Sequence, residues 1–315
     1  MGIKDVLSFF ILYFLWGTLY SQDSTFIQTF PNKLTFRLSL QTTSNSFKLR
    51  DTETRELTEF IPNDKSYLGL SAQFRSVGLD IGYAPNFLAE NKDNANSKLI
   101  TLNFRMFFNQ IMQTVDFYKQ KGFFIRNRDF TLPVEDLTTT KIGGSTSYIF
   151  NENFSFRAIG FQNEWQKKSA GSFIPRISYY FTKFQLDDPD VGNLTEHSFN
   201  LAVGPGYYYN WIFDENFIAS AGSTAGLGFD ITNSGGKTTM NALAQLIFRL
   251  SGGYNSEQFF SGININSQLL TSKSSDNLVL DDSISYLEFY VGYRFDAPKK
   301  WIEKAEEINR KFGWD

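Results

Sequence analysis

Many segments of this chain carry an apolar side chain at every second position. The pattern is clearest over residues 34–40, 77–83 and 100–106, where Leu, Ile, Phe, Val or Met alternates mainly with Thr, Ser, Gly, Asn, Asp or Arg. A period of two predicts strands with one apolar and one polar face. Many strands of about ten residues behind a secretion signal predict an all-β fold, a single antiparallel transmembrane β-barrel of an outer membrane.

The composition agrees with a barrel and argues against several other classes. Aromatic residues make up 17% of the 315 residues, with 34 Phe and 15 Tyr, which suits a lipid-facing surface with interfacial girdles. The net charge of -3 argues against a nucleic-acid partner. The chain has no Cys and one His, so we expect no disulfide, no metal site and no cofactor.

The amino terminus has the features of a signal peptide. Lys4 supplies positive charge, residues 6–16 are mostly apolar, and Ser21 is a small residue before the mature start. The alternative is a permanent membrane helix, but the apolar run is shorter than the ~20 residues that a spanning helix needs. We therefore predict a signal peptide over 1–21, a barrel over 22–296 and a tail over 297–315.

Thirteen segments fit the strand pattern, whereas bacterial barrels usually have an even number of strands. One assignment is therefore expected to be wrong, and we predict about 12 strands, with 10 or 14 as alternatives. The candidate strands are 33–41, 65–75, 76–84, 98–107, 110–118, 141–150, 153–166, 172–184, 197–211, 216–229, 239–251, 257–268 and 284–295.

Short turns and longer polar connections separate these segments. In bacterial barrels the short turns face the periplasm and the long loops face outward. Short turns are expected at 75–76, 109–110, 151–153 and 214–215, and long connections at 85–97, 119–140, 185–196 and 269–283.

The tail changes character after Pro298. Trp301, Ala305, Ile308 and Phe312 are spaced i, i+4, i+7 and i+11 among Lys and Glu residues, which predicts a short amphipathic helix. Because it follows the last strand, we expect it on the periplasmic side, where it packs against the barrel mouth or plugs it.

Charged residues on the polar strand face are expected to line the lumen. Buried charges must be paired, so five Arg and four acidic residues predict a cross-linked interior. This interior is either a polar pore or ligand cavity, or a closed small barrel held by ion pairs. The nine residues are Arg37, Asp80, Arg105, Asp116, Glu164, Arg176, Arg249, Glu288 and Arg294.

A polar stripe precedes a run of small residues over 169–172. The period of two places Gln162, Glu164, Gln166 and Lys168 on one face of a strand. This stripe fits a site for a sugar or a charged head group, and it equally fits a lumen stripe that runs into an ordinary hairpin.

The only histidine, His197, is followed by Ser198. A barrel-type lipid hydrolase would need a serine, this histidine and an acid or amide. Adjacent residues of a strand point to opposite faces, so His197 cannot act as the base for Ser198, and a different serine would be required. We therefore predict no catalytic residue and keep a hydrolase using His197 as an alternative.

Several short segments together resemble one bacterial protein family, and residues 154–158 and 162–173 (FSFRA and QNEWQKKSAGSF) are the most specific of them. Segments 23–27, 33–35, 61–63, 204–207 and 292–295 also fit. The family is the domain of unknown function 4421 family. The resemblance implies an outer-membrane β-barrel of a Gram-negative bacterium of the Bacteroidota type, and it implies no known activity. Its motif residues, which we treat as possible ligand contacts, are Gln162, Glu164, Gln166, Lys168, Ser169 and Gly171.

These observations favour a non-enzymatic protein, structural or narrow and porin-like, with a charge-paired polar lumen. Its expected partners are the outer-membrane bilayer and either a small polar solute or an envelope protein bound by the external loops or the tail. A soluble β-sandwich is an alternative that would bury the outward Phe and Leu rows against a second sheet.

Overall fold

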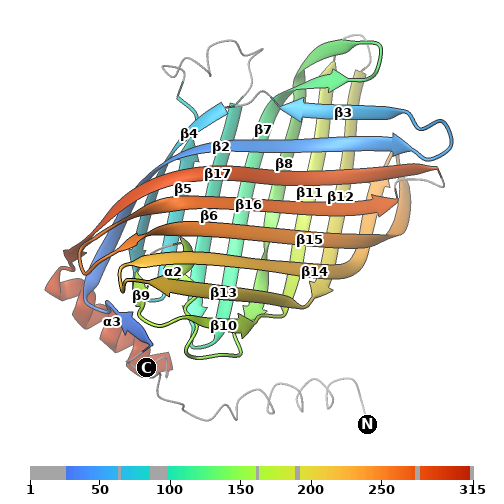
Figure 1. Cartoon of the computed structure of the whole chain (residues 1–315). Coiled ribbons are helices and arrows are strands. Elements are labelled where there is room, and N and C mark those ends of the chain that lie inside the picture. Colours follow the sequence, from blue (N-terminus) through green and yellow to red (C-terminus); the bar gives the residue numbers. More distant parts are fainter. Residues whose placement is uncertain are drawn as a thin grey trace.

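The computed structural model shows one closed antiparallel barrel (Figure 1). The predicted fold class, with 12 strands in the wall, is confirmed. Each wall strand pairs with the next in the chain, and the last pairs with the first across an unbroken ladder. The structure describes residues 26–62, 65–85, 98–160, 163–188, 192–273 and 277–312, so the predicted signal peptide lies outside the described residues.

The wall is a ring because an edge strand would leave backbone N–H and C=O groups unpaired in lipid. Its strands are β2 (Lys33–Asp51), β4 (Lys65–Phe74), β5 (Val77–Tyr83), β6 (Lys98–Phe108), β7 (Ile111–Arg126), β8 (Thr131–Tyr148), β11 (Arg176–Asp188), β12 (Gly192–Gly204), β14 (Phe217–Ser234), β15 (Lys237–Asn255), β16 (Phe259–Lys273) and β17 (Leu278–Asp296).

The alternation that predicts the strands also sorts their side chains. On β2, Phe36 and Leu38 are exposed on the outer face, whereas Thr35 and Arg37 are buried on the inner face. Beyond Leu40 the outward positions of β2 turn polar. We call the exposed apolar positions of the wall the outer apolar surface. They include Leu70, Leu79, Leu102, Ile177, Phe199, Leu246, Ile265 and Val291.

The two ends of the barrel differ. One end, which we call the turn end, carries tight hairpins at residues 75–76, 109–110 and 214–216, as predicted. Arg75, Asn109 and Asp214 adopt positive φ angles of 49°, 50° and 48° in these hairpins. The opposite end is the loop end. The first and last described residues lie at the turn end (Figure 1).

Three of the long connections predicted at the loop end are wrong. β7 and β8 pair along most of 119–140, and β11–β12 and β16–β17 extend similarly through 185–196 and 269–283. The short strand β3 (Leu57–Pro62) pairs with both β2 and β7 at this end. The outward side chains of these extensions are often polar, so the period-two pattern that marks a strand is lost. The fourth connection, 85–97, lies almost entirely outside the described residues.

Two prolines interrupt wall strands at the turn end. β10 (Ala170–Phe173) continues β11 before Pro175, and β13 (Gly206–Phe213) continues β12 after Pro205. Proline has no N–H to donate, so it breaks the ladder without changing the direction of the chain. The predicted strands 172–184 and 197–211 therefore each cover one such interrupted strand.

The predicted strand 153–166 and the turn before it are wrong. The described residues 149–160 and 163–169, which we call the plug, leave the wall and fold into the turn end of the barrel (Figure 1). The plug contains α2 (Arg157–Gly160) and β9 (Glu164–Gln166), and β9 pairs with β1 (Ile27–Thr29) instead of with the wall. Removing this one candidate from the thirteen leaves the observed twelve.

The plug folds inward because apolar side chains of the wall face the lumen at this end. Phe154, Phe156 and Ile159 pack with the wall residues Phe107, Met112 and Tyr208 in one buried cluster. Burying these rings and aliphatic chains stabilises the plug by about 1.5–3 kcal/mol for each fully buried side chain. The wall and the plug therefore share one apolar cluster at the turn end.

The predicted amphipathic tail is α3 (Lys299–Phe312). It lies along the turn end, beside the rim of the barrel (Figure 1). Among the described residues, no helix combines the length and the apolar character that crossing a bilayer requires.

Two inward aromatic rings lie flat on the wall because their cross-strand partners are glycines. Tyr208 pairs with Gly222, and Phe260 pairs with Gly292. A Cβ atom on Gly222 or on Gly292 would lie 2.0 Å from the facing ring. The glycines thus let both rings stay within the crowded interior.

We predict that Gly222→Val destabilises the barrel by about 1–3 kcal/mol, because Tyr208 would have to leave its position in the buried cluster with the plug. Thermal unfolding in detergent, followed by heat-modifiable gel migration, measures this loss. Gly252→Val is the matched control, since a Cβ there would meet its nearest atom at 3.8 Å. Equal losses in the two variants would contradict the close approach.

Candidate functional site

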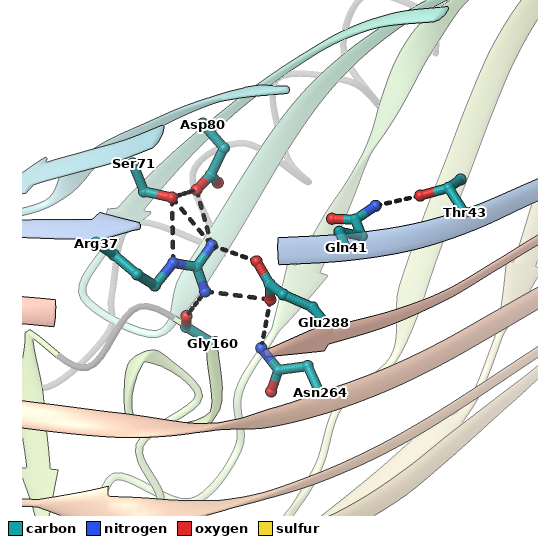
Figure 2. A network of polar contacts seen from close by, with 8 residues as sticks. All are labelled: Arg37, Gln41, Thr43, Ser71, Asp80, Gly160, Asn264 and Glu288. Atoms are coloured by element: carbon teal, nitrogen blue, oxygen red, sulfur yellow. Dashed lines mark hydrogen bonds and ion pairs between the residues drawn. The ribbon is translucent and has the colours of Figure 1, made fainter. Parts of the chain in front are cut away.

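Arg37 lies at the centre of a polar network on the inner wall (Figure 2). Its Nη2 is 3.0 Å from Asp80 Oδ1 and 3.3 Å from Glu288 Oε1. The three side chains come from β2, β5 and β17 and are 7%, 14% and 6% exposed. A guanidinium so deeply buried requires such partners, because an unpaired buried charge costs several kcal/mol. The structure thus brings three of the nine predicted lumen charges together.

Neutral groups complete this network. Arg37 Nε and Nη2 donate to Ser71 Oγ at 3.1 and 3.0 Å, and Asn264 Nδ2 donates to Glu288 Oε2 at 2.8 Å. Arg37 Nη1 also donates to the carbonyl oxygen of Gly160, the last residue of α2 (Figure 2). The network therefore connects five strands of the wall, β2, β4, β5, β16 and β17, to the plug.

Glu164 lies in the plug, and its predicted place on a wall strand is wrong. Its Oε1 is 2.9 Å from Arg157 Nη1, and its Oε2 accepts a 2.6 Å hydrogen bond from Ser155 Oγ. Ser155 Oγ also accepts the N–H of Ala158 at 3.0 Å, which caps α2. Sequence reasoning missed Arg157, because the assumed strand 153–166 hid the helical turn that brings it near Glu164.

Gln166 holds the shape of the plug through one buried amide. Its Oε1 accepts the N–H of Ser155 at 2.7 Å, and its Nε2 donates to the carbonyls of Asn153 and Lys168 at 2.7 and 3.0 Å. Asn210 of the wall donates to Gln166 Oε1 at 3.2 Å and to the carbonyl of Ser155 at 2.9 Å. A glutamine supplies both the acceptor and the donors that these backbone groups need.

The rest of the predicted motif has several local roles. Lys168 Nζ lies 5.0 Å from the ring centre of Phe26, and Ser169 Oγ accepts the N–H of Ile212 at 2.9 Å. A Cβ on Gly171 would lie 2.5 Å from atoms of the Tyr207 and Tyr209 side chains. Gln162 lies outside the described residues. Glu164 and Gln166 lie on the short strand β9 of the plug, so these two residues of the predicted stripe are not on a wall strand.

Three of the other predicted charges interact with one another, because Asp116 interacts electrostatically with Arg105 and Arg176, and also with Asp80 of the Arg37 network. Asp116 accepts a 2.9 Å hydrogen bond from the hydroxyl of Tyr180, and Arg176 Nε donates to Ser147 Oγ at 3.2 Å. Arg105 lies beside the plug, where its Nη1 would be 3.7 Å from a Cβ on Gly160. These three charges thus extend the polar interior beyond the contacts of Arg37.

The last two arginines stack on aromatic rings. Arg249 lies 5.3 Å from the ring centre of Phe156 in the plug and donates to Asn266 at 3.4 Å. Arg294 lies 4.2 Å from the ring of Phe30 and 4.9 Å from that of Phe260. Arg249 thus packs against the plug, and Arg294 packs against residues 26–32, the described segment before β2, which we call the entering chain.

Opposite walls of the barrel touch nearer the loop end. Lys141 on β8 forms an ion pair with Asp282 on β17, and Phe47 on β2 packs edge-to-face on Phe184 on β11 at 4.9 Å. β8 and β17 are separated by β7, β6, β5, β4 and β2 on one side and by β11, β12, β14, β15 and β16 on the other. The ion pair and the ring contact therefore cross the lumen.

Sequence reasoning missed these contacts across the lumen, Lys141–Asp282 and Phe47–Phe184. Asp282 falls in the predicted connection 269–283, and Phe47 lies beyond the predicted end of the first strand. The inward alternation of Arg37 and Ser39 continues to Phe47 once β2 is extended to Asp51. Extending the predicted first strand along this alternation would therefore have placed Phe47 inside the barrel.

A cavity of about 160 Å³ lies between the plug and the entering chain at the turn end. Phe30, Arg75, Arg157, Asn163 and Glu164 are among the residues that line it. Within the described parts of the chain, no three His, Cys, Asp or Glu side chains are grouped so that they could hold a metal ion.

His197 and Ser198 point to opposite sides of the wall. His197 stacks on Phe181 with ring centres 5.5 Å apart, and its cross-strand partners are Lys183 and Asn233. Ser198 is buried on the inner side, where it donates to Asp230. The geometry agrees with the inference that His197 cannot act as a base for Ser198.

Comparison with protein families matches residues 21–295 to the family described as Domain of unknown function (DUF4421). The chain belongs to this family. The match spans the wall, the plug and the described strand β1, so the plug lies within the family region and is not an addition to it.

Solved structures show only distant likenesses. The outer membrane protease OmpT from Escherichia coli has 7% identity and a TM-score of 0.36, covering 85% of this chain and 98% of its own. An outer membrane channel from Pseudomonas putida F1 has 9% identity and a TM-score of 0.39, covering 88% and 100%. The P. putida toluene transporter TodX has 10% identity and a TM-score of 0.31, covering 84% and 90%. A comparison with curated proteins found no match.

We predict that Arg37→Met destabilises the barrel by about 3–5 kcal/mol, because Asp80 and Glu288 would remain buried without their cation. Thermal unfolding in detergent measures the effect. The matched control is Lys33→Met, which breaks an ion pair to Asp296 whose side chains are 28% and 89% exposed and should cost about 0–1 kcal/mol. A loss for Arg37→Met no larger than the control would contradict the network.

We predict that Glu164→Gln loosens the plug by about 1–3 kcal/mol, because Arg157 loses its counter-charge and Ser155 loses a charged acceptor. Hydrogen exchange at the backbone amides of Ala158 and Ile159 should become faster, while exchange in β17 should not change. Glu257→Gln, at an exposed turn, is the control. Unchanged exchange in the plug would show that the pair does not hold it.

Proposed function

We propose that this protein is a structural, non-enzymatic β-barrel of the outer membrane whose lumen is closed at two levels. The location is supported by the outer apolar surface, which surrounds a closed antiparallel ring. The period-two alternation that produces this surface has its polar side inward, as a membrane barrel requires. The lipid bilayer is therefore the proposed partner of the outer face.

The orientation follows from the connections. Tight hairpins lie at the turn end together with both described ends of the chain. Since short turns face the periplasm in bacterial barrels, we assign the turn end to the periplasm and the loop end to the exterior. The polar extensions of the strands then project from the cell surface, where they offer a surface to other envelope or external molecules.

The observation that carries the proposal is the double closure of the lumen. The plug fills the periplasmic end around the cluster of Phe107, Phe156 and Tyr208. Nearer the exterior, the pairs Lys141–Asp282 and Phe47–Phe184 join opposite walls. An open porin instead requires a continuous water-filled path lined by side chains that do not meet. The closed barrel is thus favoured over the narrow porin-like alternative.

Planar-bilayer recordings of the purified protein test this proposal. We predict no steady conductance for the full chain, because each closure alone blocks the path. Truncation after Asp296 should also give no conductance, since α3 lies outside the lumen. Steady conductance of the full-length protein would overturn the proposal and support the porin-like alternative.

Two variants separate the closures. One replaces residues 151–169 with a short glycine–serine linker, and the other combines Phe47→Ala, Lys141→Ser and Asp282→Ser. We expect neither variant alone to conduct and the combination to conduct, provided that heat-modifiable migration shows a folded barrel. Conductance in the plug variant alone would show that the outer closure does not seal.

A further inference from the structure

The helix α3 presents an apolar stripe that the barrel does not cover. Trp301 and Ile308 are 52% and 40% exposed, and they lie seven residues apart on one side of the helix. Ala305 lies between them on the same side, because residues at i, i+4 and i+7 share a helix face. Two large apolar side chains so close together on an exposed helix indicate a surface that something else covers.

The stripe joins the outer apolar surface of the barrel. Trp301 packs edge-to-face on Phe74 with ring centres 6.1 Å apart. Phe74 is the last residue of β4, and its cross-strand partners are Leu34 and Val77 at the turn-end edge of the wall. Trp301 therefore lies next to the outer apolar surface at Phe74 and Val77, and a layer that covers this surface would also contact Trp301.

A second contact fixes how the helix is turned. Arg75 Nη2 lies 3.5 Å from Glu306 Oε1, and Arg75 Nε donates to the carbonyl of Pro31 at 3.2 Å. Glu306 is one residue after Ala305, so it lies about 100° around the helix from it. The ion pair thus joins one side of α3 to the barrel rim, and the stripe lies on another side of the helix, where Trp301 contacts Phe74 of the wall.

Most charged residues of α3 lie on the other sides of the helix, and Lys304 borders the stripe. Lys and Arg residues outnumber Glu residues within Lys299–Phe312, although the whole chain has a net charge of -3. A helix with an apolar stripe and a basic polar face is the type that lies in a membrane interface and favours anionic phospholipids. The basic residues are Lys299, Lys300, Lys304, Arg310 and Lys311, and the acidic residues are Glu303, Glu306 and Glu307.

We propose that α3 is a membrane-surface helix whose stripe, Trp301, Ala305 and Ile308, inserts into the phospholipid leaflet at the turn end of the barrel. This inference rests on the proposed membrane location of the wall. The occupant is lipid because the stripe continues a lipid-facing surface and its flanking charge is positive. Helices of this type bury their apolar face about 5–10 Å into the boundary between head groups and acyl chains.

Site-directed spin labelling tests this insertion. The natural chain has no cysteine, so a single introduced cysteine gives a unique label. We would label Ile308→Cys on the stripe, Glu303→Cys on the opposite, polar side of the helix as its control, and Val291→Cys on the outer wall as a lipid-exposed reference. Each full-length protein is reconstituted into vesicles of phosphatidylethanolamine and phosphatidylglycerol, and collisions with oxygen and with a water-soluble nickel chelate are compared.

We expect the label at 308 to resemble the label at 291, with high access to oxygen and low access to the chelate, and the label at 303 to show the reverse. Chelate access at 308 equal to that at 303 would overturn the insertion. Low access to both reagents at 308 would mean that protein, such as a second copy of the chain, covers the stripe, which also overturns it. Water exposure at 291 would instead overturn the membrane location itself.

Discussion

The pairing of every backbone polar group within the wall is the constraint on which this structure depends. In lipid an unpaired N–H or C=O costs several kcal/mol, so the ladder must close, and β17 pairs with β2 over the whole length of both strands. A closed ladder with a period of two gives each strand one outward and one inward face. Once lipid selects apolar residues for the outer face, the polar residues have to be accommodated inside.

The interior of the barrel shows two solutions to that problem. On the inner wall, Arg37 is neutralised by Asp80 and Glu288, which come from strands on both sides of it. Other inward positions hold Phe107 and Met112, and the plug packs its own apolar residues against them. The interior thus combines paired charges with apolar packing, and the plug contacts both.

The sequence predicted the wall much better than the interior. Segment 34–40 could be assigned because lipid imposes a strict alternation on its outer face. The plug segment 153–166 could not be recognised, since Phe154, Ser155 and Phe156 also alternate although they belong to a compact turn before α2. The inward apolar residues Phe107 and Met112 were the available signal that something apolar fills the lumen. No local pattern could show that Lys141 meets Asp282, because that contact joins strands on opposite sides of the ring.

The distribution of charge shows how the plug can sit in a charged barrel. Arg37 finds its two carboxylates in the wall, whereas Glu164 finds Arg157 within the plug. The bonds that link plug and wall at these points run to neutral groups: Arg37 donates to the carbonyl of Gly160, and Asn210 donates to the carbonyl of Ser155. Because Arg37 and Glu164 each find their ionic partners on their own side of the boundary, the contact between plug and wall at these two points depends on shape and on neutral hydrogen bonds. The family motif around Glu164 and Gln166 is therefore explained by the internal structure of the plug, without any need for a ligand.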